Sequence, residues 1–250
     1  MSGKGLLLNQ GSPLWQQFLD ALYPRNCLSC FTPLDSTTVL RYLCNDCFQQ
    51  VEVFNPPQCH RCGLPFYGTV TTSRDCPHCK ELEPHFGNGQ TTFRLRSPMR
   101  ALIHALKYGK GHYALPDLVK VALQAPKTRE FLEGAVLIPV PLHPWRQFKR
   151  TFNQSELLAK TLCKELDNTR VELLLKRTKW TSTQTLLTHQ ERQRNLKNVF
   201  AINSQTAIDP NQRYVVVDDV FTTGATLNSC CKTMRQAGAT KLDIFALGHG

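Results

Sequence analysis

Short unbroken runs of apolar residues punctuate the carboxyl-terminal part of the chain, and they predict the strands of a sheet. Val136–Val140 and Tyr214–Val217 are rich in β-branched residues, a composition typical of strands buried on both faces of a parallel sheet. The pattern predicts three more strands, at Thr91–Arg96, Val171–Leu175 and Lys241–Leu247. Of these, Thr91–Arg96 alternates as a half-buried strand would.

Segments with a helical period lie between these runs. The predicted helices run from Ser97-Pro98 through Leu106, over about residues 115–124, from a capping box at Asn153 and Glu156, and from Leu227 to a stop at Gly238. Strands that alternate with helices predict a doubly wound α/β domain over residues 91–250, with a parallel sheet. Its ligand is then expected outside the carboxyl ends of the strands.

The amino-terminal residues 1–24 carry a separate helical pattern. Apolar residues between Ser12 and Pro24 recur at the spacing of an amphipathic helix. Its polar face lacks the Lys and Arg that favour membrane binding, so we expect it to dock against the neighbouring domain; a peripheral place at the inner membrane is the alternative. No apolar run approaches the ~18–20 residues of a membrane span, and none resembles a secretory signal. We therefore expect a cytoplasmic protein without stable membrane insertion.

Eight of the 11 cysteines follow one spacing that occurs twice. The pattern C-x₂-C-x₁₃-C-x₂-C is formed first by Cys27, Cys30, Cys44 and Cys47, and again by Cys59, Cys62, Cys76 and Cys79. A C-x₂-C knuckle presents two thiolates on one side of a tight turn, and two knuckles complete a tetrahedral Cys₄ zinc site. The spacing therefore predicts a small double zinc ribbon over residues 25–82 with two zinc ions.

These cysteines are expected to be reduced and to bind metal. Thiols stay reduced in the cytoplasm, which argues against disulfides, and the segment has few large apolar residues, so metal would supply much of its folding free energy. We expect each ion to be held by four consecutive cysteines; an interleaved pairing is the alternative. Closed Cys₄ sites leave no open position, so the zinc is expected to be structural. His60 and His78 lie inside the knuckles and are not expected to bind metal.

Charge is distributed unevenly along the chain. Residues 1–90 carry 6 Lys and Arg against 7 Asp and Glu, whereas residues 91–250 carry 24 against 12. The basic part is therefore the predicted α/β domain. This balance favours a polyanionic ligand, either a phosphorylated sugar or nucleic acid; a merely solvated basic surface is the alternative.

The stretch after the Tyr214–Val217 strand carries the chemistry of a sugar-phosphate site. Asp218 and Asp219 stand where that strand is predicted to end, and the small-residue turn that leads into the next helix is Thr222, Thr223, Gly224, Ala225 and Thr226. Backbone N–H groups at such a turn and helix N-terminus bind phosphate, and hydroxyls add donors. Paired carboxylates suit vicinal sugar hydroxyls and a hard cation such as Mg²⁺. An ordinary strand–turn–helix unit is the alternative.

Val215–Thr226 resembles the phosphoribosyl-pyrophosphate (PRPP) signature of type I phosphoribosyltransferases, in which apolar residues precede two acids and T-T-G-x-T. The resemblance implies that Asp218 and Asp219 hold the ribose hydroxyls and that the turn wraps the 5′-phosphate. The signature usually has Gly at the position of Ala225, which matters if the backbone there requires a positive φ. Together with PVPLHPWRxxxRxFNQ at Pro139–Gln154 and the cysteine repeat, it makes the chain similar to the ComF/GntX family. These are phosphoribosyltransferase-like proteins linked to bacterial DNA uptake and use of external DNA.

Three arginines are candidates for the pyrophosphate. Arg146 and Arg150 lie in a proline-set turn, where guanidinium groups match a bidentate pyrophosphate site; a solvent-facing basic loop is the alternative. Lys176–Lys197 is long and polar, and it corresponds to the loop that closes over the substrate in phosphoribosyltransferases. Closure would bring Arg192 near the pyrophosphate and exclude water; a surface loop without catalytic duty is the alternative.

The resemblance implies a PRPP-binding protein that acts in uptake or use of external DNA, with Mg²⁺-dependent displacement at ribose C1 and an acceptor that is left open. The candidate catalytic residues are Asp218, Asp219, Arg146, Arg150 and Arg192, and Thr222–Thr226 would hold PRPP or another phosphorylated sugar. Two alternatives use the fold without catalysis, as a single-stranded-DNA-binding protein or as a PRPP-sensing regulator; DNA-uptake proteins would then be partners. Few residues follow the last predicted strand, so we expect the zinc ribbons to cover the site.

Overall fold

A computed structural model gives the structure of residues 25–35, 38–66, 68, 70–108, 111–142, 152–178, 199–203 and 207–250. The predicted amino-terminal helix and the three candidate arginines lie outside these described residues. The helices are α2 (Asn45–Gln49), α3 (Pro77–Leu82), α4 (Met99–Tyr108), the 3₁₀ helix η1 (Gly111–Ala114), α5 (Leu115–Ala122), α6 (Thr128–Leu132), α8 (Gln154–Glu165) and α10 (Ala225–Gln236). The strands are β1 (Gly89–Arg94), β2 (Val136–Pro139), β3 (Arg170–Val171), β4 (Leu175–Arg177), β5 (Phe200–Ile202), β6 (Arg213–Phe221) and β7 (Lys241–His249).

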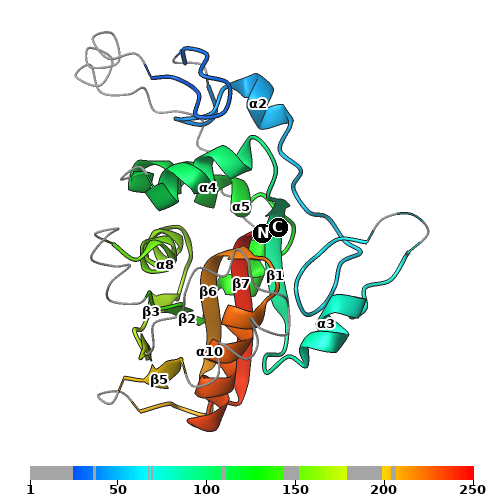
Figure 1. Ribbon diagram of the computed structural model, residues 1–250, viewed down its shortest axis with the longest axis vertical. Helices are drawn as coiled ribbons and strands as arrows, with labels where there is room; N and C mark the ends of the chain where they lie inside the picture. The colour runs from blue at the N-terminus through cyan, green and yellow to red at the C-terminus, as the bar shows by residue number, and fades with distance from the viewer. Residues whose placement is uncertain are drawn as a thin grey trace, which may run out of the picture.

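Five strands form one parallel sheet in the order β1-β7-β6-β2-β3, with helices on both faces (Figure 1). Successive residues of a strand point to opposite faces. Accordingly, Val215 and Val217 of β6 join the hydrophobic cluster of α4, α5 and α8, whereas Val216 joins the cluster of α10. The predicted doubly wound α/β fold is confirmed.

The central strand β6 is longer than the sequence pattern predicts. It does not end at Val217 but continues through both aspartates to Phe221. The reason is its neighbour β7, which keeps pairing in parallel register from Arg213 opposite Lys241 to Phe221 opposite His249. The acids therefore lie within a paired strand near its carboxyl end, and not in a loop beyond it.

The predicted strand Val171–Leu175 is wrong, because the chain leaves the sheet inside it. β3 is the short outermost strand of the main sheet, and β4 pairs antiparallel with β5 in a separate two-stranded sheet. Leu173, between them, is half exposed. An apolar run does not show where a chain passes from one sheet to another. The sequence pattern therefore predicted one strand where the structure has two, β3 and β4.

The first sheet strand is also more buried than its alternating sequence predicts. β1 spans Gly89–Arg94, slightly before the predicted Thr91–Arg96, and all but its last residue are buried. Its outer edge is covered by the segment that joins the two cysteine units, since Phe54 N–H donates to Thr92 O over 2.8 Å and Arg94 N–H donates to Glu52 O over 3.0 Å.

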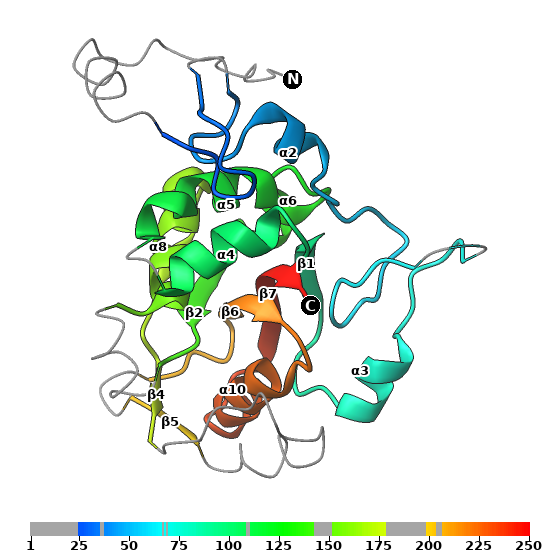
Figure 2. The same ribbon diagram turned by 45° about the horizontal axis from the view of Figure 1, so that its top comes forward.

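The two cysteine units pack on different sides of the α/β core (Figure 2). The first lies over α4 and α5, where the buried Asp117 carboxylate accepts the backbone N–H of Arg41 over 3.0 Å and of Tyr42 over 2.7 Å. The second, with α3, lies beside β1 and α10 in both views. Among the described residues, no helix has the length and apolar character to cross a membrane.

Candidate phosphoribosyl site and zinc centres

Asp218 and Asp219 contact two different helices near the carboxyl end of β6. Asp218 Oδ1 accepts the hydroxyl of Ser155 on α8 over 2.9 Å and also accepts the backbone N–H of Asp219 over 2.9 Å. Asp219 is 4% exposed, and its Oδ2 lies 2.9 Å from Nζ of Lys107 at the end of α4. That contact is an ion pair rather than an aligned hydrogen bond, since Oδ2 has no hydrogen-bond partner among the described residues.

The two carboxylates differ in their electrostatic surroundings. Burial, and then the charge of Asp219, raise the pKa of Asp218 to about 7, against weaker opposing effects of the Asp219 N–H and the Ser155 hydroxyl. Lys107 contacts Asp219 directly, so its positive charge acts more strongly on Asp219 than on Asp218. Near neutral pH the pair therefore carries less than two full negative charges.

Sequence reasoning did not find Lys107 and Ser155. Lys107 directly follows Leu106, the last apolar residue of a predicted helix. Ser155 lies in the first turn of α8, where Asn153 supplies the expected cap by accepting the Ser155 N–H over 3.1 Å. The signal that could have found Ser155 is its position directly after the motif that ends at Gln154. No local pattern pairs Lys107 with an acid so far along the chain.

The turn from β6 to α10 depends on one glycine. Gly224 has a φ of +67°, and a Cβ there would lie 2.5 Å from Cζ of Phe221. Only glycine fits this position without a shift. Ala225 begins the α10 helix and is not among the residues with positive φ, so its side chain needs no such freedom.

The threonines of this turn have unequal access to solvent. Thr222 is exposed, Thr223 and Thr226 are partly buried, and the N-terminus of α10 follows directly. The turn is therefore accessible to solvent at Thr222. On its other side it meets the second cysteine unit, where His78 Nε2 lies 3.1 Å from Thr223 O.

The two segments that carry the candidate arginines are each closed at the base by hydrogen bonds between their flanks. Arg146 and Arg150 lie outside the described residues, but the flanks of their segment meet, since Asn153 Nδ2 donates to Val140 O over 3.1 Å. Arg192 is likewise outside. Its segment is closed at the base by β4 and β5, and Thr178 N–H donates to Val199 O over 2.8 Å. Their roles remain predictions.

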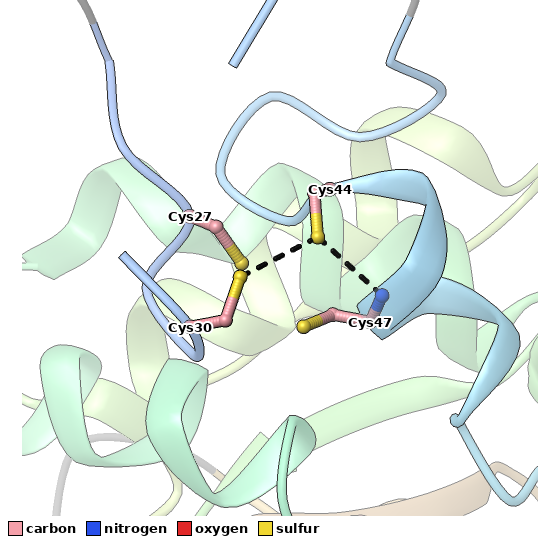
Figure 3. Close-up of side chains that lie close together, drawn as sticks. All are labelled: Cys27, Cys30, Cys44 and Cys47. Carbon is pink, nitrogen blue, oxygen red and sulfur yellow. Dashed lines mark hydrogen bonds between the residues drawn. The ribbon is translucent and has the colours of Figure 1, made fainter. Parts of the chain in front are cut away.

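The cysteine sulfurs gather in two sets of four. Within each set the Sγ atoms lie within 4.8 Å of one another, and the sets are sequential, so the interleaved pairing is excluded. Cys30 and Cys44 Sγ are 3.6 Å apart in the first set (Figure 3), and Cys62 and Cys76 Sγ are 3.8 Å apart in the second. Four thiolates around one zinc at ~2.3 Å imply sulfur separations of about 3.8 Å, so both sets fit a tetrahedral ion.

The two sulfur clusters differ in exposure. In the first, Cys30 is exposed and Cys44 is partly exposed, whereas all four cysteines of the second are buried. Backbone N–H groups add to each cluster, with Cys47 N 3.4 Å from Cys44 Sγ and Cys76 N 3.3 Å from Cys59 Sγ. Such donors favour the thiolate form that binds metal.

Comparison with known proteins gives one matching family description and several relatives. Residues 18–80 match the double zinc ribbon domain. Competence protein F of Haemophilus influenzae is 32% identical over 213 residues, 83% of this chain and 90% of its own. DNA utilization protein YhgH of Escherichia coli K12 is 30% identical over 193 residues, 76% of this chain and 82% of its own.

Among solved structures, a purine phosphoribosyltransferase from Pyrococcus horikoshii aligns over 58% of this chain and 85% of its own, with 16% identity and a TM-score of 0.32, too low to argue from. The relatives, the two cysteine clusters and the parallel sheet together identify the family. The chain belongs to the ComF family, in which a double zinc ribbon is joined to a type I phosphoribosyltransferase-like α/β domain.

Proposed function

We propose that this protein binds PRPP together with Mg²⁺ at the turn Thr222–Thr226 and transfers its phosphoribosyl group to an acceptor during the uptake or use of external DNA. The biological setting is taken from relatives whose names are competence protein F and DNA utilization protein. The phosphoribosyl chemistry is taken from the residues of the turn and of β6.

One observation carries the proposal. Two adjacent acids lie near the carboxyl end of the central strand, and the exposed Thr222 and the N-terminus of α10 follow within the same turn. A helix N-terminus with free backbone donors favours a phosphate. Adjacent acids near the end of the strand instead favour the hydroxyls of a sugar. The order of the two along the chain suits a ribose 5-phosphate whose phosphate lies over the turn.

Each group of residues has its own role in the proposed reaction. Asp218 and Asp219 accept the ribose 2′ and 3′ hydroxyls, and the turn holds the 5′-phosphate. Mg²⁺, when bound, neutralises the pyrophosphate, helped by Arg146, Arg150 and Arg192. A bond forms between the acceptor and ribose C1, while the C1–oxygen bond breaks and pyrophosphate leaves with the electron pair.

Calorimetry with PRPP and Mg²⁺ tests the binding step. Wild type is expected to bind, and Asp218→Asn/Asp219→Asn is expected to lose affinity by about tenfold or more because each carboxylate gives up charge-assisted hydrogen bonds. Asp167→Asn, at an exposed acid away from the site, is the matched control and should bind like wild type. A folded, zinc-loaded wild type that gives no binding heat would overturn the proposal.

A second assay separates transfer from sensing. Release of pyrophosphate with an added acceptor supports the transferase. PRPP binding that changes the affinity for a partner without pyrophosphate release supports the regulator instead.

Single-stranded DNA binding is the second candidate, and a groove favours it. A cavity of about 410 Å³ lies between the first zinc ribbon and α4, lined by Leu28, Ser97, Arg100, Ala101, His104 and Ala105. Tyr108 is 68% exposed, and its ring centroid lies 4.8 Å from that of His104 in this lining. Aromatic side chains beside cations suit the stacked bases and phosphates of a single strand.

Fluorescence anisotropy with a labelled oligothymidylate tests this candidate at several salt concentrations. Arg100→Ala/Tyr108→Ala should weaken binding by about tenfold, because stacking and a phosphate contact are both lost. Arg129→Ala, at an exposed arginine of α6, is the control. Affinity that depends on neither salt nor the double variant would rule out this groove as the DNA site.

A further inference from the structure

The second zinc ribbon contacts the phosphate turn through a histidine that lies between two zinc ligands. His78 stands in α3 between Cys76 and Cys79, and its Nε2 is 3.1 Å from the backbone oxygen of Thr223. Because a carbonyl oxygen only accepts, Nε2 is the protonated nitrogen and donates the hydrogen bond. The imidazole also meets Phe221 edge to face, with ring centroids 6.4 Å apart.

This bond fixes the direction of a backbone donor. In a trans peptide the carbonyl of one residue and the N–H of the next point in opposite directions. Holding Thr223 O toward the ribbon therefore turns the N–H of Gly224 away from it. Backbone N–H groups that face away from the protein at a helix N-terminus are the groups that bind a phosphate.

Leu82, at the end of α3, packs against the same turn. A Cβ on Gly224 would lie 2.9 Å from Leu82 Cδ2, so this side chain packs directly on the glycine backbone. Leu82 is 4% exposed. The positive φ of Gly224 is thus held between Phe221 on the strand side and Leu82 on the ribbon side.

The first turns of α10 are fastened to the chain that leaves α3. Asn228 Nδ2 donates to Leu82 O over 3.1 Å, and its Oδ1 accepts the His85 N–H over 2.7 Å. One α10 side chain therefore satisfies two backbone groups at the end of α3. The turn and the start of the helix are both attached to the ribbon.

We propose that the second zinc ribbon holds the phosphate turn in its binding conformation, with His78 as the positioning residue. The inference rests on the proposed PRPP site. α3 has six residues, too few to be a stable helix on its own, so the zinc ligands at Cys76 and Cys79 fix the position of His78. The first ribbon makes its contacts elsewhere, with Asp117 on α5.

The experiment compares His78→Leu, His78→Gln and His60→Leu. Leucine removes the donor, whereas a glutamine amide nitrogen reaches about as far as Nε2 and donates. His60 is the matched control, since it lies in the other knuckle of the same zinc site and is exposed. Metal analysis should find two zinc ions per chain in all three variants, which separates loss of positioning from loss of the ribbon.

Two readouts are needed. Hydrogen–deuterium exchange of residues 222–228 in the free protein requires no ligand, and it should be faster in His78→Leu only. PRPP affinity, measured by calorimetry with Mg²⁺, should fall by about tenfold in His78→Leu and by no more than about threefold in His78→Gln and His60→Leu.

The outcomes are distinguishable. Unchanged exchange and unchanged PRPP affinity in His78→Leu would overturn the inference, as would a loss of affinity that His78→Gln shares in full. If wild type binds no PRPP but His78→Leu still exchanges faster at 222–228, the proposed function falls and the positioning of the turn by the ribbon stands.

Discussion

Lys107 places its ammonium nitrogen 2.9 Å from a carboxylate oxygen of Asp219, although the two residues come from different layers of the fold. The acid is almost fully buried and the lysine side chain is 25% exposed. A buried carboxylate without a counterion is costly, so this lysine offsets the cost of burying one of the two site acids. The ion pair also ties the end of α4 to the central strand.

Replacing Lys107 with methionine should lower the free energy of unfolding by about 1–3 kcal/mol, because the carboxylate of Asp219 stays buried without its cation. Lys107→Arg keeps the charge and should lose less. Urea unfolding measures both. In the double variant Lys107→Met/Asp219→Asn most of the loss should be recovered; a double variant as unstable as the sum of the single ones would show that the pair is not coupled.

The raised pKa of Asp218 predicts proton release on binding. Carboxylates that hold ribose hydroxyls and Mg²⁺ act in the ionised form, and in the free protein the pKa of Asp218 is raised to about 7. Binding of Mg²⁺ and PRPP at about pH 6 should therefore release a proton that is not released at about pH 8. Calorimetry in buffers of different ionisation enthalpy measures the release. Asp218→Asn corrects for protons from the ligand, and a release of equal size in that variant would contradict the assignment.

The same pKa predicts how stability depends on pH. The folded pKa of Asp218 lies above its usual value of 3.8, so between the two the folded state binds more protons than the unfolded state. The free energy of unfolding should then fall as pH rises from about 4 to about 7, and level off above. Asp218→Asn removes this contribution, so its stability relative to wild type should grow over that window. A constant difference in urea unfolding experiments would refute this.

Gly224→Ala should be far more damaging than Ala225→Gly at the next residue. Gly224→Ala places a Cβ 2.5 Å from Phe221 at a φ of +67°, and should cost about 1–3 kcal/mol of stability together with PRPP binding. Ala225→Gly, at the first residue of α10, should cost at most about 1 kcal/mol and keep binding. Thermal unfolding and calorimetry measure the pair. Intact binding in Gly224→Ala would show that the turn does not hold the phosphate.

The two zinc ions should leave at different rates. The first sulfur cluster has an exposed Cys30, whereas the second is buried throughout, so a chelator reaches the first ion sooner. A chromogenic chelator should report one fast and one slow equivalent of zinc per chain. Cys44→Ser should hold one ion and lack the fast phase. Release of both ions in a single phase from wild type would contradict the prediction.

The repeated spacing of the cysteines was the strongest signal in the sequence, and it identified the metal sites. Cysteine positions identify four-ligand sets because a knuckle is local and a second knuckle must complete it, so both clusters and their sequential pairing could be predicted. The alternation of strands and helices predicted the doubly wound sheet in the same way. In both cases the signal repeats along the chain.

Contacts between distant segments were not predictable. The end of β6 is set by its pairing with β7, and the partner of Asp219 is set by where α4 packs, so neither Phe221 nor Lys107 carries a local signal. The sequence indicates only that His78 lies inside a zinc knuckle and is not expected to bind metal, whereas the structure places it against Thr223. The sequence showed which residues have useful chemistry, but not which ones meet.

Each zinc ribbon is continuous with a different hydrophobic cluster. Cys27 and Cys47 belong to the cluster that contains α4, α5 and α8, and Cys59 and Cys79 to the one that contains α10. A chain shortened to residues 91–250 would thus uncover apolar surface on both sides of its sheet at once. Binding of each zinc ion would therefore help to bury its own face of the sheet, and the folded state would gain stability as the supply of zinc rises.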